Sequence, residues 1–161
     1  MLRMAKSVLV LTVALWGFVG AFQNVLDWNG TIAAVNAATS MSTFSGGAES
    51  WQSTSNLLVV WIGALFIMLS KVASAVLCTI GGWRMLRTRN SSAEDFVAAK
   101  HIALTGCAIA VIMLFGGFIV IAESWFELWR SDAMRGPVLE SAFRYAGMIM
   151  LIAVFVSSQE E

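Results

Sequence analysis

Residues 57–83 read LLVVWIGALFIMLSKVASAVLCTIGGW, and this stretch decides the fold of the chain. It contains one charged side chain, that of Lys71. A helix that spans a bilayer needs about 20 predominantly apolar residues. In lipid, the backbone N–H and C=O groups of a single span must bind one another, and an α-helix achieves this. The stretch therefore predicts a transmembrane helix.

Three further apolar runs of similar length lie at about 2–22, 101–122 and 138–156. The last run follows Pro137, which suits the first turn of a helix because proline there loses no helical hydrogen bond. The four runs predict an all-α membrane protein with a single domain, 1–161. We expect this domain to be an antiparallel bundle of four transmembrane helices.

The composition supports a membrane location. Hydrophobic residues make up 58% of the 161 residues, and charged residues make up 12%, against about 25% in an average soluble domain. Ten Lys and Arg balance ten Asp and Glu, which excludes a polybasic protein that binds nucleic acid. The single His and the two Cys form no catalytic or metal-ligating motif, so we do not expect an enzyme.

The distribution of charge predicts the orientation of the bundle, because Lys and Arg favour the cytoplasmic side of transmembrane helices. One end of the bundle has six basic residues, namely Arg3, Lys6, Arg84, Arg87, Arg89 and Lys100. It also has four acidic residues, namely Glu94, Asp95, Glu160 and Glu161. The other end has three basic residues, Arg130, Arg135 and Arg144. We therefore expect both termini in the cytoplasm.

The first apolar run also resembles a secretory signal peptide. Arg3 and Lys6 precede an apolar core, and Val19-Gly20-Ala21 resembles a cleavage site. We expect this run to be retained as the first transmembrane helix.

The outer loop, 23–56, is long for a connection without structure of its own. Within it, Trp28, Ile32 and Val35 recur at helical spacing after Asp27, which is a good N-cap residue. This spacing predicts a short amphipathic helix at about 29–38, lying on the outer membrane surface. We expect Thr54 or Ser55 to cap the second transmembrane helix.

Lys71 is the sharpest feature of the sequence, because an ammonium at the centre of a bilayer costs about 3 kcal/mol. No acidic residue is expected at matching depth within the chain. Three explanations remain open. The side chain snorkels toward an interface from a tilted helix; it binds a carboxylate or carbonyl of another subunit or cofactor; or it lines a water-filled ion or substrate path.

Ser70, Ser74, Cys78 and Gly82 repeat every four residues on one face of the second helix. Small residues let helices approach closely in lipid, so this face is expected to pack against another helix. Lys71 adjoins Ser70 and Ser74, which makes all three candidates for an interface with a partner. We expect Cys78 and Cys107 to be reduced packing residues.

His101 begins the third run beside Lys100. The simplest interpretation is a histidine at the membrane interface. A second interpretation is an axial ligand of a haem or a chlorophyll-type pigment. Ligation of haem by two histidines of this chain is excluded, because the sequence has one His. We expect no cofactor held within the chain, although lipid or a partner's pigment or haem remains an open contact.

Trp125, Phe126 and Trp129 are expected to form an aromatic belt at the outer interface, which Trp28 and Trp51 join. Trp125 and Trp129 are also candidates for an interface with a partner. Tryptophan concentrates at this depth because its ring is amphipathic.

Arg144 follows Glu140 by four residues, in the orientation that favours an ion pair on a helix. Together with neighbouring charges, this pair is expected to anchor the third and fourth helices. It is also a candidate docking site for a partner outside the membrane.

Several motifs resemble those of one bacterial family. They are Asn24-x-x-Asp27, Ala75-Val76-Leu77-Cys78, Gly82-Trp83-Arg84, Gly117-Phe118-Ile119, Trp125-Phe126-x-x-Trp129 and Ala142-Phe143-Arg144. Over nearly its whole length the chain resembles the predicted small integral membrane proteins that share a domain of unknown function. The resemblance implies a four-helix protein of the bacterial inner membrane, and it implies no activity.

The preferred functional hypothesis is a non-catalytic accessory subunit of a larger inner-membrane complex of respiratory, photosynthetic or dehydrogenase type. Its partners would be other integral membrane subunits and lipid. The alternative is a small transporter or channel component that uses Lys71 and Arg144 within the membrane. A third hypothesis is an electron-transfer protein with a bound cofactor.

Overall fold

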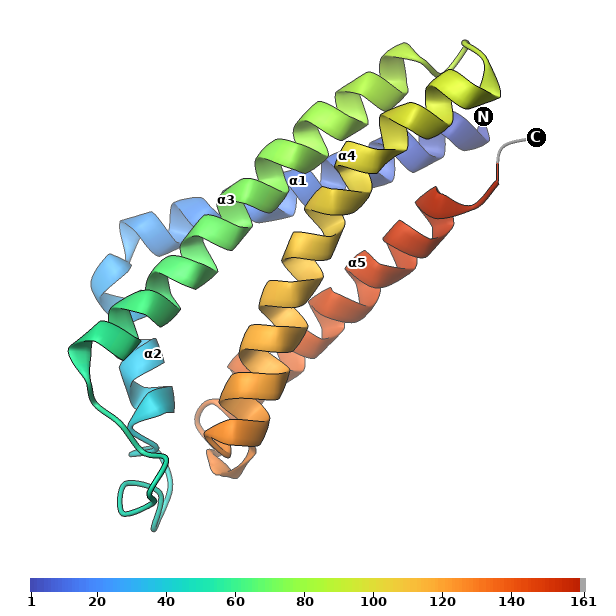
Figure 1. Ribbon diagram of the computed structural model, residues 1–161. Coiled ribbons are helices and arrows are strands. Elements are labelled where there is room, and N and C mark those ends of the chain that lie inside the picture. Colours follow the sequence, from blue (N-terminus) through green and yellow to red (C-terminus); the bar gives the residue numbers. More distant parts are fainter. Residues whose placement is uncertain (160–161) are drawn as a thin grey trace.

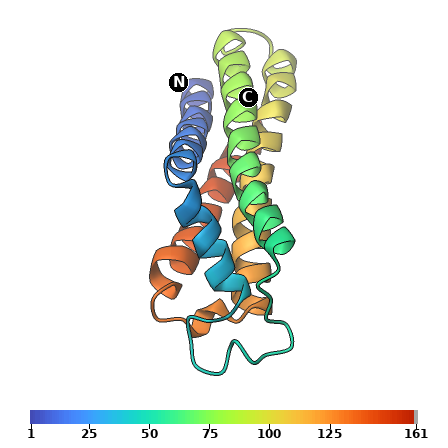
Figure 2. The same cartoon turned by 90° about the vertical axis from the view of Figure 1, so that its left-hand side faces the viewer.

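The computed structural model describes residues 1–159, and the chain forms a bundle of four long helices (Figures 1 and 2). The elements in order are α1 (Leu2–Leu26), α2 (Trp28–Thr39), α3 (Leu57–Arg87), α4 (Ala93–Val111), π-helix η1 (Ile112–Trp125), 3₁₀-helix η2 (Leu128–Arg130), π-helix η3 (Arg135–Glu140) and α5 (Ser141–Ser157). Glu160 and Glu161, which we counted with the inner charges, lie outside the described residues.

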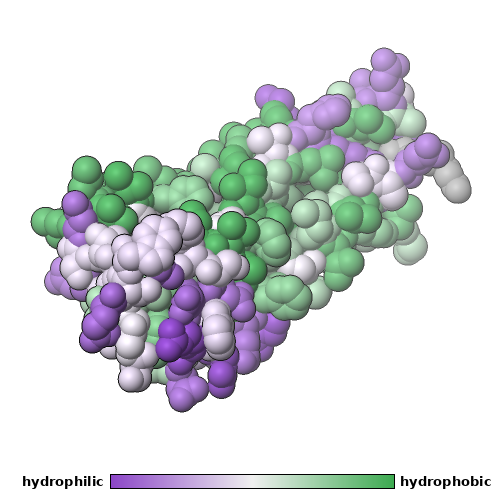
Figure 3. Space-filling view, turned by 60° about the horizontal axis from the view of Figure 1, so that its bottom comes forward, coloured by the Kyte–Doolittle hydropathy of each residue, from purple (hydrophilic) through white to green (hydrophobic). Residues whose placement is uncertain are grey.

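The four expected spans are confirmed as helices long and apolar enough to cross a membrane. They are Leu2–Leu26, Leu57–Arg87, Ala93–Trp125 and Arg135–Ser157. At most 28% of the most apolar window of each span is buried, so most of its residues are at least partly exposed at the surface of the bundle. The space-filling view shows polar residues at the two ends and a mainly apolar surface between them (Figure 3). This surface is the one that lipid would cover.

The third span begins earlier than expected, at Ala93 instead of about 101. Ser92 caps this helix, because its Oγ accepts a hydrogen bond from the backbone N–H of Asp95 and donates one to the Asp95 carboxylate. Phe96 is fully buried against the bundle, which gives the polar first turns an inner face. The connection from α3 is therefore reduced to 88–92.

The first span is longer than expected, since α1 continues to Leu26. Asp27 then ends α1 and caps α2, as its side chain accepts a hydrogen bond of 2.9 Å from the N–H of Gly30. Residues 29–38 are thus helical, as expected, and their helix packs against α3. Its position on a membrane surface stays a prediction.

The cap of α3 was predicted wrongly. The structure places Asn56 at that position, where its side-chain oxygen accepts a hydrogen bond of 2.9 Å from the N–H of Leu58. The hydroxyl of Thr54 instead accepts from the N–H of Asn56. Thr54 therefore supports the cap residue.

Helix α3 is central to the bundle and is packed closely by α1 and α4. A Cβ atom added at Gly81 would lie 2.6 Å from the Cα of Ala103, and one at Gly106 would lie 2.9 Å from the backbone nitrogen of Cys78. On the other side, a Cβ at Gly17 would lie 3.0 Å from the carbonyl oxygen of Lys71. Backbone approach of this kind is typical of helix packing in membranes.

The start of α1 and the end of α5 lie at the same end of the bundle as the α3–α4 turn (Figure 1). There the buried ammonium groups of Lys6 and Lys100 donate hydrogen bonds of 3.1 and 2.8 Å to the carbonyl oxygen of Ser158. Arg3 donates to the carbonyl of Ser91, at 2.8 Å. These bonds join α1, α4, the α3–α4 turn and the end of α5 at the end that the charge distribution predicts to be cytoplasmic.

Candidate functional site

A mainly apolar recess of the bundle is lined by α3, η1 and α2. It lies where α3 and η1 diverge and α2 lies against α3 (Figure 1). It is a cavity of about 540 Å³, open on one side to the surroundings. Its walls come from α1, α2, α3, η1, the turn after η1 and the start of the fourth span. The lining residues are Asn24, Thr31, Ala34, Val35, Ala38, Thr39, Val59, Ile62, Gly63, Phe66, Ile67, Lys71, Gly117, Phe118, Ile121, Ala122, Phe126, Leu128, Met134 and Val138. We call it the α2–α3–η1 cavity.

Two glycines shape the walls of this cavity. A Cβ atom added at Gly117 would lie 3.1 Å from the ring of Phe66, and one added at Gly63 would lie 2.9 Å from the side chain of Val35. Glycine at these two positions therefore lets the side chains of neighbouring helices approach. Apart from Asn24, Thr31, Thr39 and Lys71, every lining residue is apolar.

The ammonium of Lys71 donates a hydrogen bond of 2.9 Å to the side-chain oxygen of Asn24. The stem of Lys71 lies along Gly20, where an added Cβ would be 3.3 Å from the Lys71 Cδ. Sequence reasoning missed Asn24, because the first helix was expected to end near residue 22. The continuation of α1 to Leu26 carries Asn24 to the level of Lys71.

The wall formed by η1 is a π-helix, whose hydrogen bonds join residues five apart. At its end, the hydroxyl of Ser124 donates to the carbonyl of Ile119, and the N–H of Phe126 donates to the carbonyl of Ile121. π-Helical turns occur frequently at functional sites. Here the π-helix contributes Gly117, Ile121 and other residues to the cavity.

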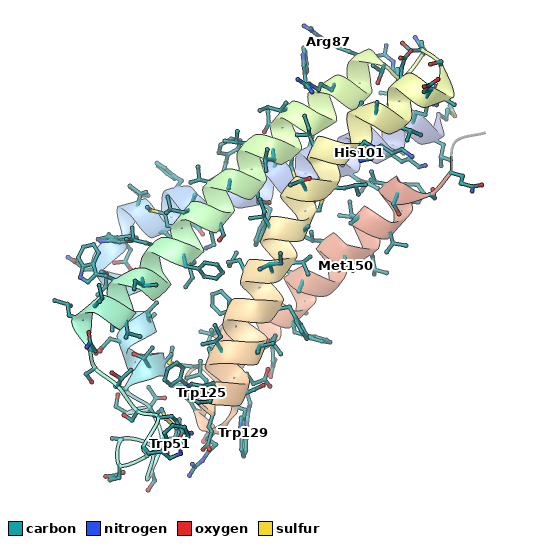
Figure 4. All side chains as sticks on the ribbon, in the orientation of Figure 1. Trp51, Arg87, His101, Trp125, Trp129 and Met150 are labelled. Carbon is teal, nitrogen blue, oxygen red and sulfur yellow. The ribbon has the colours of Figure 1, made fainter. Side chains whose placement is uncertain are left out.

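Beyond the cavity, the loop 40–56 is held against the end of η1 (Figure 4). The rings of Trp51 and Trp125 meet edge to face with centroids 5.3 Å apart, and Gln52 donates a hydrogen bond to the carbonyl of Trp125. Trp28 contacts Trp61 at 5.8 Å between centroids. Trp129 lies nearby and is half exposed. The tryptophans expected in the outer belt thus gather at one end of the bundle.

Residues 2–159 match a family described as "Predicted small integral membrane protein (DUF2165)". The chain belongs to this family. No curated protein and no solved structure matches the chain. Membership establishes that the chain is an integral membrane protein, and the four apolar helices are its candidate spans.

In this small integral membrane protein, the other candidate interface residues lie apart from the cavity. Ser74 is buried where α3 crosses Gly106 of α4, and Ser70 is half-buried one turn earlier. The Sγ atoms of Cys78 and Cys107 are 3.9 Å apart at the same crossing, and both cysteines are free. The small-residue face therefore packs inside the bundle over most of its length.

Arg144 does not form the expected ion pair with the Glu140 carboxylate among the described residues. Its guanidinium donates to the backbone carbonyl of Glu140 at 3.2 Å and to the hydroxyl of Ser141 at 3.0 Å. Both Arg144 and Glu140 are exposed at the start of the fourth span, so their side chains face outward. Their role as a docking site for a partner stays a prediction.

His101 is exposed on α4, two turns after the helix begins at Ala93 (Figure 4). It therefore does not begin the third helix, as the sequence suggested. Within residues 1–159, no group of three or more His, Cys, Asp or Glu side chains is arranged to hold a metal ion. A haem or pigment contact at His101 stays untested.

Arg130 contacts the loop 40–56, and its replacement by alanine tests whether these contacts keep the loop in place. Its guanidinium donates a hydrogen bond of 2.8 Å to the Glu127 carboxylate and one of 3.1 Å to the carbonyl of Ser45. The guanidinium also lies over the ring of Phe44. Hydrogen bonds to charged groups contribute about 1.5–3 kcal/mol. We expect Arg130→Ala to raise the rate of chymotrypsin cleavage within 40–56 about tenfold, measured by mass spectrometry of the detergent-solubilised protein.

The control is Arg135→Ala, because its ion pair with Asp132 spans 3.6 Å and is largely exposed. This variant should be cleaved at the wild-type rate. Equal cleavage of the Arg130 and Arg135 variants would show that Arg130 does not hold the loop.

Proposed function

We propose that this protein is a non-catalytic accessory subunit of a larger assembly in the bacterial inner membrane, and that it holds an apolar ligand in the α2–α3–η1 cavity. The ligand would be a lipid or the apolar part of a cofactor that a partner also contacts. The proposal rests on the cavity itself, which has a volume of about 540 Å³ and mostly apolar walls.

The size and lining of the cavity match those of ligand sites. Sites for small molecules and cofactors enclose about 300–1,000 Å³ and combine apolar walls with a few polar groups. The α2–α3–η1 cavity has four polar lining residues among twenty. Water is poorly held by apolar walls. An apolar molecule from the bilayer is therefore the occupant that the lining favours.

The arrangement of spans and connecting segments in the chain supports a role as a subunit. Among the described residues, the segments outside the candidate spans are α2, the loop 40–56 and short turns. They provide little material for a separate catalytic domain. Most residues in the apolar windows of the spans are at least partly exposed, and lipid or neighbouring membrane subunits would cover them.

The experiment is purification from native membranes in a mild detergent, followed by native mass spectrometry. We expect partner membrane subunits to co-purify in fixed ratio and a lipid-like molecule to remain bound. Ala34→Trp fills the cavity and should reduce the bound molecule at least tenfold. Gly147→Trp is the matched control, because a Cβ added there meets nothing within 4 Å.

Two results would count against the proposal. A chain that always migrates as a free monomer would remove the subunit role. Retention of the bound molecule by Ala34→Trp would remove the cavity as its site.

A small transporter or channel component is the second candidate, favoured by the position of Lys71 at an open cavity. Arg144 does not line this cavity and instead binds groups of its own helix. If the protein is a transporter, the wild type should produce a flux in proteoliposomes, and Lys71→Met should abolish that flux. Absence of flux in the wild type, or equal flux in the variant, would reject this candidate.

The predicted orientation can be tested by labelling single cysteines in intact cells, in a background in which Cys78 and Cys107 are replaced by alanine. Ala48→Cys lies in the exposed outer loop, and Asn90→Cys lies in the exposed α3–α4 turn. A membrane-impermeant maleimide should label residue 48 in intact cells and residue 90 only after permeabilisation. The reverse pattern would place both termini outside the cytoplasm.

A further inference from the structure

We infer that the α2–α3–η1 cavity binds a single-chain carboxylate amphiphile, such as a fatty acid, with its carboxylate paired to Lys71. This inference rests on the proposed function, because it names the class of ligand that the cavity holds. Three observations carry it: the charge at Lys71, the remaining donors of Asn24 and the apolar walls that continue from this pair.

The charge of Lys71 is balanced by no carboxylate in the described part of the chain. Its hydrogen-bond partner is the amide oxygen of Asn24, which is neutral. No ion pair to Lys71 is present among residues 1–159. A cation within a membrane is costly unless an opposite charge or polar groups compensate it. One negative charge on a ligand would supply the missing compensation.

The polar end of the cavity presents donors for both oxygens of a carboxylate. The Lys71 ammonium has three donors, of which one binds Asn24. The Asn24 amide has two donors on Nδ2, and neither makes a hydrogen bond within residues 1–159. Charge-assisted hydrogen bonds to a carboxylate are about twice as strong as neutral ones. Lys71 and Asn24 together therefore form a head-group site.

The remainder of the cavity suits one hydrocarbon chain. Along α3, the lining runs from Lys71 to Val59, which is about 18 Å at the rise of an α-helix. Ile62, Phe66 and Ile67 lie on this stretch, opposite Phe118 and Ile121 of η1. A single cation matches a single negative charge. A carboxylate therefore fits better than a phosphate monoester, which carries nearly two.

The test compares palmitate with hexadecanol, which has the same chain and a neutral head. Binding of each is measured to the purified full-length protein in a non-ionic detergent, by isothermal titration with native mass spectrometry as a second readout. For the wild type we expect palmitate to bind at least tenfold more tightly than hexadecanol.

Variants at the head-group site distinguish the effect of losing the positive charge from the effect of losing the folded structure. Lys71→Met should remove the preference, so that palmitate and hexadecanol bind this variant about equally, and its circular dichroism spectrum shows whether it is folded. Lys71→Arg keeps the positive charge and should retain the preference. Asn24→Asp places a carboxylate beside Lys71 and should weaken palmitate binding at least tenfold more than it weakens hexadecanol binding.

The outcomes distinguish the two proposals. If palmitate and hexadecanol bind the wild type equally, or if Lys71→Met keeps the preference for palmitate, the inference about the carboxylate is overturned and the cavity remains a ligand site. If neither amphiphile binds, or if Ala34→Trp binds both as the wild type does, the proposed ligand-holding function is overturned with it.

Discussion

Replacement of Gly81 by leucine is expected to lower the free energy of unfolding by about 3 kcal/mol, the largest effect among the substitutions considered. A Cβ at this position would lie 2.6 Å from the Cα and 2.7 Å from the Cβ of Ala103. The Ala103 backbone cannot rotate away as a long side chain would. Helices α3 and α4 must therefore separate, and the contacts of Cys78 with Cys107 at the same crossing would be lost.

The measurement is reversible unfolding of the protein in mixed micelles by increasing amounts of a denaturing detergent, followed by circular dichroism. Gly147→Leu is the control, since a Cβ atom added at Gly147 meets nothing within 4 Å, and it should leave the midpoint close to that of the wild type. Equal midpoints for the two variants would mean that α3 and α4 are not packed backbone to backbone at Gly81.

Replacement of Asn24 by leucine is expected to cost about 2 kcal/mol of stability, because a partly buried charged group that loses its hydrogen-bond partner is penalised by roughly this amount. The lost bond is the one of 2.9 Å from the Lys71 ammonium. In a Lys71→Met background the same replacement should cost less than about 0.5 kcal/mol, because no cation remains to be satisfied. The four proteins form a double-mutant cycle.

The same unfolding assay, in detergent without added amphiphile, provides the measurement. Gln23→Leu is the matched control, because Gln23 adjoins Asn24 on α1 and its side chain is exposed. It should change stability by no more than about 0.5 kcal/mol in either background. A cost for Asn24→Leu that is the same with and without Lys71 would show that the two side chains do not interact.

Much of the fold follows from apolar runs and local signals. The run 57–83 predicts α3 to within a few residues, and Pro137 lies in the first turn of the fourth span. Asp27 caps a helix, as its position before Trp28 indicated. These features depend on residues close together in the sequence, where helix propensity, capping and hydrophobic length act directly.

The candidate site depends on contacts between distant parts of the chain, and for this reason the sequence predicted it only in part. Lys71 was singled out, because a charge in an apolar run is conspicuous. Asn24 was placed in a loop, because two polar residues, Gln23 and Asn24, interrupt the apolar run before α1 ends. The cavity itself results from the divergence of α3 and η1, which no local pattern of residues indicates.

The start of α4 was misplaced for a related reason. Residues 93–100 contain Glu94, Asp95 and Lys100, so they do not extend the apolar run that begins at 101. Their helix is stabilised by the Ser92 cap and by burial of Phe96. The hydropathy of a segment therefore predicts which part of a helix lies within the membrane better than it predicts the residue at which that helix begins or ends.

The bonds from Lys6 and Lys100 to the carbonyl of Ser158 have a consequence for biogenesis. Helices α1, α3 and α4 can pack against one another as soon as α4 has left the ribosome, because their crossings involve no residue of α5. The carbonyl of Ser158 arrives only with the last span. We therefore expect the final helix to complete this end of the bundle, which the charge distribution predicts to be cytoplasmic, and an arrest of translation between α4 and α5 should leave a three-helix intermediate in the membrane.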